Sequence, residues 1–468
     1  MDVKVNKNKF WLVITNGLLL IICTAFLLKT YNSTISDINW ANEAFFLSIL
    51  TITFNLISFY VLKVRISEFQ FVIMFLTYPF MYGRIWLHYL NLDEDVYWSL
   101  HKLFSYYDMR LASVFCVCCT QALFLGMILN YKKYTNDLCL FNIEEDDIDL
   151  FNTGLLMLMI GLPCRIITDI NSIITTQATG SIESIASRAG LADDFAYFFI
   201  PAILFIMIGK PKIRKTIFLI VCIYYVIVMS VTGDRRYYVT AIVAMGAFLL
   251  FLNSEKTKKI KWYKWIFLGY IALVFVNFLE VIRKMRLGGL VSFVDFVKIY
   301  GSDIFFMKDL LMDILTEFGI SFFSVVAMMS NVEKILGYQY GMSFIRAIPT
   351  VFPIGGVFGD FFDKGSPSTF INAYTGLPVG ATIFGDMYAN FGYLSILGII
   401  ILGIILSTIF NKGAYSNKFD VVIYYTEFYI LINLVRCTFF EIVRPIVWCI
   451  ITAIFLYQIV LKKKNGKE

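Results

Sequence analysis

The chain has 468 residues, of which 59% are hydrophobic and only 16% are charged. Soluble domains carry about a quarter of charged residues, so this composition excludes an ordinary soluble enzyme, a disordered chain and a nucleic-acid-binding protein. The formal net charge is +6, and the two histidines, His88 and His101, are too few for a histidine-based metal cluster. The useful unit of length is therefore the membrane-spanning helix, which needs about 20 apolar residues.

Apolar runs predict an all-α integral membrane protein with about twelve transmembrane helices. The first run follows a basic N-terminus and is too long for the core of a cleaved signal peptide, so we expect it to remain as a helix. The predicted helices span residues 10–28, 43–62, 69–90, 111–131, 152–173, 193–209, 216–232, 237–253, 265–282, 391–410, 421–438 and 445–461.

Basic residues are concentrated in alternate connections. The two chain ends and every second connection between predicted helices together hold 22 of the 40 basic residues. The positive-inside rule places these segments in the cytoplasm. Both termini are then predicted to be cytoplasmic, which agrees with an even number of helices.

One connection, residues 283–390, is much longer than the others and falls on the non-cytoplasmic side. Within it, 291–315 has apolar residues at helical spacing and predicts an amphipathic helix at the membrane interface. Residues 316–330 are apolar but few, and either a re-entrant or a spanning helix fits them. Residues 341–380 are rich in Gly and Pro and predict an irregular loop. The predicted organisation is 1–282 with helices one to nine, 283–390 as the large outer loop, and 391–468 with helices ten to twelve and a basic tail.

Arginine and lysine are distributed differently. Of the 27 lysines, 20 lie in predicted cytoplasmic segments, whereas 11 of the 13 arginines lie in outer loops or within helices. The guanidinium group binds phosphate oxygens in pairs, and an ammonium group does not. This pattern favours a phosphate-bearing ligand at the outer leaflet. The alternative is that single arginines contact lipid headgroups or pair with acids. The eleven are Arg84, Arg110, Arg165, Arg188, Arg235, Arg236, Arg283, Arg286, Arg346, Arg436 and Arg444.

Several of these arginines have a specific context. Arg84 and Arg165 fall within apolar runs, where a charge costs about 2.5–3.5 kcal/mol on insertion scales. That cost predicts either a partner acid or a cavity that holds an anion. Arg235 and Arg236 precede the helix predicted at 237–253, and a helix N-terminus favours anions.

Two further pairs of arginines lie at the ends of predicted helices. Arg283 and Arg286 are three residues apart and share one helix face. Arg436 and Arg444 flank the last short outer turn, together with Glu441.

Asp386, Asp360 and Asp363 are the candidates for a general base, in that order, because low polarity raises the pKa of a carboxyl toward neutrality. Capping of the following helix is the alternative role for Asp386. Asp93 and Asp95 form a DxD pair, for which a divalent metal and simple solvation are the two interpretations.

Three features together give the chain a family resemblance. They are the turn TGDRR at 232–236, the large outer loop before the last helices, and the pattern GDMYANFG at 385–392, which places Asn-Phe-Gly at the start of a predicted helix. In these features the chain resembles the Wzy-type polymerases of O-antigen and capsule repeat units.

The resemblance implies a GT-C-like helical fold and an inverting glycosyltransferase that uses no cofactor and no metal. The donor is then a growing glycan on undecaprenyl pyrophosphate, and the acceptor is one lipid-linked repeat unit. The catalytic candidates are Asp386, Asp360 and Asp363. The substrate-binding candidates are Arg235, Arg236, Arg283, Arg286, Arg346, Arg84, Arg165, Arg436, Arg444, Tyr388 and Asn390.

The resemblance also implies a bacterial cytoplasmic membrane location. Membrane lipid, a chain-length regulator and a flippase are the implied partners, and nucleic acid is not. A flippase of lipid-linked oligosaccharides, an O-antigen ligase and a solute transporter are the rival functions. The long loop argues against a flippase, and its lack of histidine argues against a ligase. A transporter more often shows broken helices in paired halves, which this sequence lacks.

Overall fold

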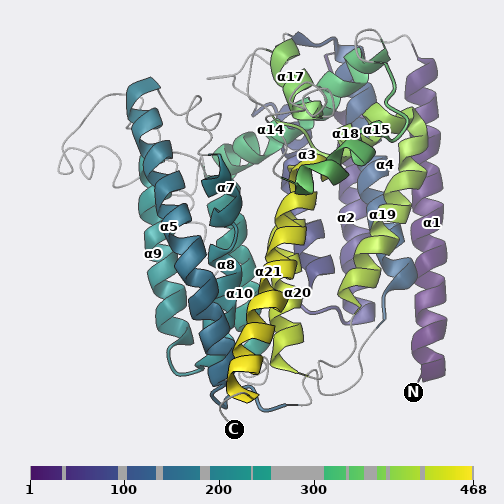
Figure 1. Ribbon diagram of the computed structural model, residues 1–468. Coiled ribbons are helices and arrows are strands. Elements are labelled where there is room, and N and C mark those ends of the chain that lie inside the picture. Colours follow the sequence, from purple (N-terminus) through teal and green to yellow (C-terminus); the bar gives the residue numbers. More distant parts are fainter. Residues whose placement is uncertain are drawn as a thin grey trace. The chain divides into compact units, whose positions relative to one another are not determined.

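The computed structural model is helical throughout its described part, and no strand occurs there (Figure 1). In lipid a helix satisfies its own backbone hydrogen bonds, which explains why apolar runs adopt this form. The structure describes residues 2–33, 38–92, 103–132, 141–179, 190–232, 236–253, 310–333, 337–352, 366–375, 380–411 and 417–465.

Eight helices within these residues are long and apolar enough to cross a membrane. They are Asn8–Asn32, Asn42–Leu62, Tyr106–Asn130, Ile148–Thr176, Leu191–Gly209, Arg214–Thr232, Ile383–Phe410 and Phe439–Lys463. Shorter apolar helices add Tyr237–Leu252, Phe318–Asn331 and Met342–Val351. The chain is therefore a multi-pass integral membrane protein.

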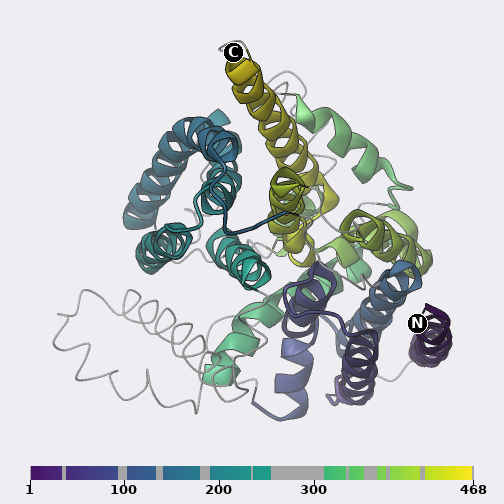
Figure 2. The same cartoon turned by 90° about the horizontal axis from the view of Figure 1, so that it is seen from below.

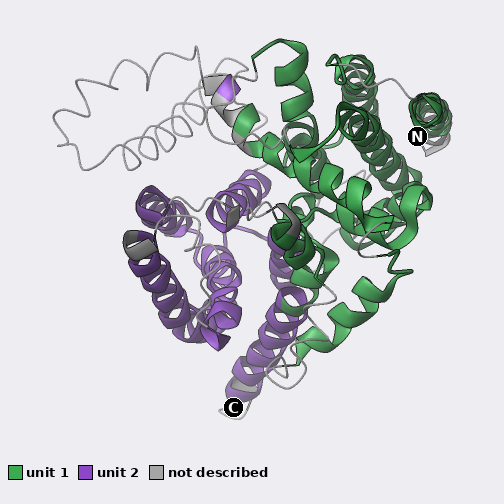
Figure 3. Ribbon diagram, turned by 90° about the horizontal axis from the view of Figure 1, so that it is seen from above, with its two compact units in different colours: residues 1–138, 315–415, 431–444 green, residues 139–314, 416–430, 445–468 purple. Residues whose placement is uncertain are grey.

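The helices gather into two compact units, each built from segments that are distant in the sequence (Figure 3). Unit 1 comprises residues 1–138, 315–415 and 431–444. Its elements are α1 (Asp2–Asn32), α2 (Asn42–Leu62), α3 (Phe69–Tyr89), α4 (Tyr106–Asn130), most of α14 (Leu310–Asn331), α15 (Met342–Ala347), η3 (Ile348–Val351), α17 (Pro367–Thr375), α18 (Ile383–Phe391), η4 (Gly392–Leu394), α19 (Ser395–Phe410), η5 (Ile432–Val435) and the first turns of α21 (Phe439–Asn465).

Helix α4 forms the core of unit 1. Its apolar stretch is completely buried, and it packs against α1, α2, α3 and α19. Small side chains permit this close packing, as is common between membrane helices. At the closest approach to α19, a Cβ atom added to Gly126 would overlap the backbone oxygen of Ile400, and one added to Gly403 would overlap that of Leu123. Glycine is therefore required on both helices.

Buried polar side chains join the helices of unit 1. Asn16 of α1 donates to the hydroxyl of Ser58 on α2 (2.9 Å), and Gln121 of α4 donates to Asn16 (3.0 Å). Asn55 of α2 donates to the hydroxyl of Tyr78 on α3 (3.1 Å). Hydrogen bonds of this kind hold helices together where lipid offers no hydrophobic driving force.

The two ends of unit 1 differ in chemistry. At one end Lys9, near the start of α1, donates to the carbonyl of Tyr131 (2.8 Å). At the opposite end the hydroxyl of Tyr107 donates to the carbonyl of Tyr31 (3.1 Å), and Arg110 pairs with Glu43. Helices α15, α17 and α18 lie at this second end, away from the N-terminus (Figure 1).

Unit 2 comprises residues 139–314, 416–430 and 445–468. Its described elements are α5 (Ile148–Thr179), α7 (Leu191–Ala196), α8 (Phe199–Gly209), α9 (Arg214–Thr232), α10 (Arg236–Leu252), most of α20 (Lys418–Leu431) and α21 from Pro445. Helix α5 packs on α7, α8 and α9, and α10 packs on α8 and α9. This grouping is visible end-on in Figure 2.

Most predicted helices are found near their predicted bounds, with informative differences. Residues 316–330 belong to one helix, α14, which already begins at Leu310, so no boundary separates them from the end of the predicted amphipathic segment. The helix predicted at 391–410 begins only at Ser395, after the break at Gly392. The segment 421–438 contains α20 followed by the 3-10 turn η5. The predicted helix at 265–282 lies outside the described residues, so the number twelve stays a prediction.

Candidate functional site

The motif GDMYANFG forms α18 and the break that follows it. Thr382 is the N-cap residue, and its hydroxyl accepts a hydrogen bond from the N–H of Gly385 (3.2 Å). Asp386 lies within α18, and the following helix α19 has Leu394 as its N-cap residue and no side-chain cap, so the alternative role of Asp386 as a cap of that helix is wrong. Asn-Phe-Gly ends α18 rather than starting a helix, because Gly392 adopts a positive φ of 56°. Asp386 points into the protein and is completely buried.

One oxygen of Asp386 is held by two side chains. Oδ1 accepts a hydrogen bond from the hydroxyl of Ser343 on α15 (2.7 Å) and one from the amide of Asn390 on α18 (3.1 Å). The same amide also donates to Ser343 Oγ (2.7 Å). Oδ2 is buried and has no hydrogen-bond partner among the described residues, and the backbone N–H of Phe439 lies close enough to the carboxyl group to act on it.

Helix α15 is fixed to α18 through backbone bonds in the preceding turn. The amide oxygen of Asn390 accepts from the N–H of Gly341 (2.9 Å). The N–H of Gln339 donates to Ala389 O (2.9 Å), and that of Tyr340 donates to Asn390 O (3.1 Å). These bonds set the position of Ser343 against Asp386.

A second acid approaches the same place from the start of α21. Glu441 acts electrostatically on Asp386, and its Oε1 accepts a hydrogen bond from Ser368 of α17 (2.9 Å). The rings of Phe344 and Phe439 meet at 5.6 Å and help to hold α15 beside α21. Four short segments of unit 1 thus converge on Asp386.

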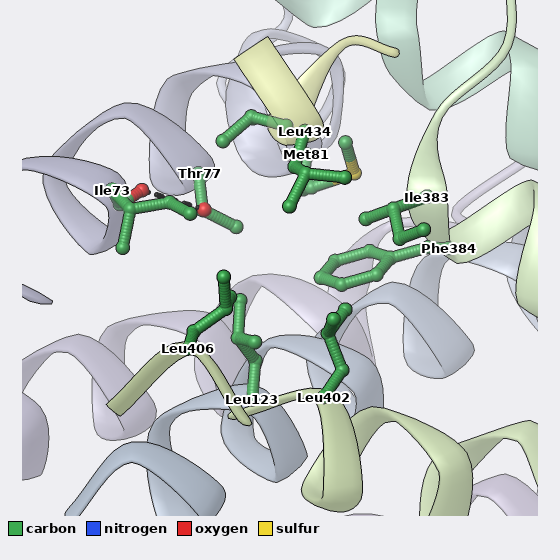
Figure 4. A pocket seen from close by; sticks show the side chains of 10 residues that line it. Ile73, Thr77, Met81, Leu123, Ile383, Phe384, Leu402, Leu406 and Leu434 are labelled. Atoms are coloured by element: carbon green, nitrogen blue, oxygen red, sulfur yellow. Dashed lines mark hydrogen bonds between the residues drawn. The ribbon is translucent and has the colours of Figure 1, made fainter. Parts of the chain in front are cut away.

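An apolar cavity of unit 1 reaches the first turn of α18 (Figure 4). Its one hydroxyl, that of Thr77, donates to the carbonyl of Ile73 in its own helix (2.7 Å). The lining residues are Ile73, Thr77, Met81, Leu123, Ile383, Phe384, Leu402, Leu406, Leu434 and Val435. Because this lining is almost entirely apolar and offers no charge, the cavity is not suited to a sugar or a phosphate.

Four of the predicted substrate-binding arginines lie in unit 1. Arg346 follows Ser343 by three residues on α15, and its guanidinium donates to Gln339 Oε1 (3.3 Å). Arg444 follows Glu441 by three residues, so the two share a face of α21.

The other two arginines of unit 1 lie against aromatic rings. Arg84 is buried and stands over the ring of Phe323 at 5.7 Å, and Arg436 stands over that of Phe80 at 5.8 Å. His88, four residues after Arg84 on α3, stacks on Trp40 at 4.6 Å.

Arg165 lies in unit 2 and has a partner acid. Asp169, one turn further along α5, accepts from Arg165 Nε (3.0 Å) and pairs with its Nη2. The hydroxyls of Tyr224 and Tyr238 donate to the same carboxylate at 2.5 Å and 2.7 Å. A structural ion pair therefore offsets the burial of Arg165. Asp169 is not among the residues predicted from the sequence, although its spacing of four residues from Arg165 is typical of an ion pair on one helix face.

Comparison with known proteins assigns this helical protein to a family. The family described as O-antigen polysaccharide polymerase Wzy matches residues 10–465. The chain belongs to this family. No curated protein and no solved structure matches it. The resemblance identified from the sequence is confirmed, and the Wzy family indicates an O-antigen repeat-unit polymerase that acts on lipid-linked oligosaccharide repeat units in the membrane.

The remaining candidates of the polymerase fall largely outside the described residues. Within the described part, no group of His, Cys, Asp and Glu is arranged to hold a metal ion. Arg236 is the first residue of α10. Asp360, Asp363, Arg235, Arg283, Arg286, Asp93 and Asp95 all lie outside the described residues.

Proposed function

We propose that this polymerase transfers a growing glycan from undecaprenyl pyrophosphate to a hydroxyl of a new lipid-linked repeat unit, with inversion at the anomeric carbon. Asp386 carries this proposal. It is a fully buried carboxyl group in a membrane protein of the Wzy family, with one oxygen held by Ser343 and Asn390. Ionisable groups at membrane depth are expensive and usually functional.

In the proposed reaction Asp386 is the general base. The acceptor hydroxyl attacks the anomeric carbon of the donor while its proton passes to the carboxylate. The bond between that carbon and the pyrophosphate oxygen breaks, and undecaprenyl pyrophosphate leaves with the electron pair. A single displacement of this kind inverts the configuration. Asp360 and Asp363 remain the second and third candidates for the base.

Arginines would hold the pyrophosphate and stabilise it as a leaving group. Arg346 is the first candidate in unit 1, because it shares α15 with the residue that binds Asp386. Arg84, Arg436 and Arg444 are further candidates in the same unit. Arg235, Arg236, Arg283 and Arg286 remain candidates from the sequence alone. Tyr388 and Asn390 complete the proposed substrate-binding set, and Asn390 also positions the base.

We place the reaction at the outer face of the bacterial cytoplasmic membrane, with both termini in the cytoplasm. Lysines of the predicted cytoplasmic segments support this orientation. Lys9 lies at one end of unit 1, whereas α15, α17 and α18 lie at the other (Figure 1). A chain-length regulator and a flippase are the proposed protein partners, as the resemblance to the Wzy family implies.

A test in the host compares deletion of the gene with complementation by the wild type and by Asp386→Asn. We expect wild-type complementation to restore long glycans, and Asp386→Asn to leave single repeat units exposed outside. Asp108→Asn is the matched control, because Asp108 is a carboxylate that accepts a hydrogen bond from Ser105 at the start of α4 and is not among the groups that act on Asp386. Full polymer length with Asp386→Asn would remove that residue from the reaction.

The same deletion separates the rival functions. Repeat units trapped on the cytoplasmic side would indicate a flippase, and long polymer retained on its lipid carrier would indicate a ligase. Inversion is tested by NMR of the anomeric configuration in the lipid-linked repeat unit and in the polymer linkage. An unchanged configuration would rule out the single displacement.

A further inference from the structure

A row of tyrosines runs from the Asp386 motif toward the surface of unit 1. Tyr340 meets Tyr338 with ring centroids 6.5 Å apart, and Tyr338 meets Tyr388 at 6.2 Å. Tyr388 in turn meets Tyr393 at 5.5 Å, and Tyr393 meets Tyr31 at 5.5 Å. We call these five residues the tyrosine row. They come from three separate parts of the chain, so the fold assembles the row.

The row is buried in the middle and open at its ends. Tyr388, two residues after Asp386, is 2% exposed, whereas Tyr340 is 80% exposed and Tyr31 is 55% exposed. Burial of a large aromatic ring normally stabilises the folded protein. The exposed rings of Tyr340 and Tyr31, connected through the buried Tyr388, therefore indicate a surface that binds a ligand or partner.

The backbone at Tyr340 is strained and firmly held. Its φ of 49° lies in the left-handed region, which residues other than glycine rarely adopt. The neighbouring bonds to Ala389 and Asn390 of α18 hold the turn in this shape. Strain that the surroundings enforce is typical of functional positions. Asn390 thus holds the backbone of the turn at Tyr340 with the same side chain that contacts Asp386.

Tyr338 links the row to a carboxylate. Its hydroxyl donates to Glu333 Oε1 (2.6 Å), and burial together with this carboxylate raises the pKa of Tyr338. A Cβ atom on Gly392 would come within 3.2 Å of the Tyr338 ring, and Gly392 also needs its positive φ, so glycine makes room for this ring. A lipid-anchoring tyrosine sits at the headgroup boundary without needing an acid beside it. Ring faces combined with a carboxylate instead suit a ligand that has apolar faces and hydroxyl groups.

We propose that the tyrosine row, with Glu333, is a carbohydrate subsite in which a pyranose ring of the repeat unit stacks on Tyr340 and Tyr338. The face of a pyranose that is rich in C–H bonds is apolar and slightly positive, which matches the negative face of an aromatic ring. The Glu333 carboxylate accepts hydrogen bonds from sugar hydroxyls at the edge of the stack. This inference rests on the proposed function for the identity of the glycan and extends it to a defined binding surface.

The test measures binding rather than turnover. The probe is the oligosaccharide repeat unit released by mild acid from the host's own surface glycan, added to the purified full chain in detergent. Saturation-transfer NMR and titration give its affinity. We expect Tyr340→Ala to weaken binding about tenfold, the size expected from loss of one stacked ring. Tyr340→Phe should bind within about threefold of wild type, because the ring and not its hydroxyl makes the stack.

Tyr60→Ala is the matched control, because Tyr60 is 84% exposed on α2 and lies outside the row. It should bind as the wild type does. Equal affinity of Tyr340→Ala and wild type would overturn the subsite and leave Tyr340 as an interface anchor. Failure of the wild-type chain to bind the oligosaccharide would overturn the subsite as well.

Asp386→Asn separates this inference from the proposed function. It should lose polymerisation but keep oligosaccharide affinity, since Asp386 is buried beside the row and is not part of it. If Asp386→Asn still polymerises, the base assignment is wrong while the subsite stands. If Asp386→Asn is inactive and Tyr340→Ala binds normally, the base assignment stands while the subsite is wrong.

Discussion

Ser343 donates a hydrogen bond of 2.7 Å to Oδ1 of Asp386 across a separation of 43 residues. Hydrogen bonds to charged groups contribute about 1.5–3 kcal/mol, so Ser343→Ala should slow polymerisation roughly ten- to a hundredfold. The measurement is the rate of polymer growth by purified protein in vesicles. Ser330→Ala is the control, because that hydroxyl donates to the backbone of α14 and accepts from the amide of the adjacent Asn331 (2.7 Å), not from or to Asp386. Equal rates for both variants would show that Ser343 does not position Asp386.

Arg346 tests whether a guanidinium fork binds the pyrophosphate. Arg346→Ala should raise the KM for the lipid-linked repeat unit roughly tenfold or more, because a charge-assisted hydrogen bond is lost. Arg346→Lys should restore the affinity for the lipid-linked repeat unit only in part, since an ammonium group cannot bind two phosphate oxygens in parallel. Arg65→Ala removes an arginine from a predicted cytoplasmic loop and should leave KM unchanged. Full recovery by lysine would contradict paired recognition.

The pair of Arg165 and Asp169 should behave as a structural unit. Asp169→Ala leaves the buried guanidinium without its acid, at a cost of about 3–5 kcal/mol, so we expect poor yield of folded protein. Arg165→Met combined with Asp169→Leu removes both charges and should restore folding. Thermal unfolding in detergent measures the stability of the single and double variants against that of the wild type. A double variant that folds and still polymerises would take Arg165 off the list of substrate-binding residues.

Gly126 tests the close packing of α4 on α19. Gly126→Ala places a methyl group against the backbone of Ile400, and we expect a loss of about 1–3 kcal/mol in stability. Gly17→Ala on α1 is the control, because nothing lies within 4 Å of its added Cβ. Replacement of a helical glycine by alanine without a clash is neutral or slightly stabilising. Similar melting temperatures for both variants would contradict the packing argument.

The orientation of unit 1 is open to chemical labelling. Tyr340→Cys and Lys63→Cys place a thiol at two exposed positions with positive φ, one beside the site and one in a predicted cytoplasmic loop. In intact spheroplasts a membrane-impermeant maleimide should label only the first, relative to the wild-type background. Labelling of Lys63→Cys alone would place the site in the cytoplasm.

Much of the fold was predictable, because twenty apolar residues in lipid have few alternatives to a helix. The family followed from short motifs and the long outer loop. The predicted helix boundaries were wrong where a break in the backbone determines where a helix starts or ends. Gly392 divides the predicted helix 391–410 from α18, and apolarity alone does not show this. Similarly, α14 continues through the change in composition near residue 315.

The candidate site was predictable only in part. Asp386 was ranked first from its motif, but nothing in the sequence links it to Ser343 on another helix. Thr382, four residues before Asp386, caps α18, and the helix that Asp386 was expected to cap begins only at Ser395, without a side-chain cap. Asp169 carried a usable signal in its spacing from Arg165. Long-range contacts of this kind are set by packing, which a single sequence does not display.

The hydrogen bonds around Asn390 run in one direction. Its amide oxygen accepts from the N–H of Gly341, so its nitrogen must face Ser343 and Asp386. Ser343 Oγ accepts a hydrogen bond from that nitrogen and donates its own single proton to Oδ1 of Asp386. Oδ1 is thereby fixed as an acceptor. In the proposed reaction Oδ2 is therefore the oxygen of this carboxyl group that takes the proton from the substrate, and the backbone N–H of Gly341, at the start of the neighbouring helix α15, determines this through Asn390.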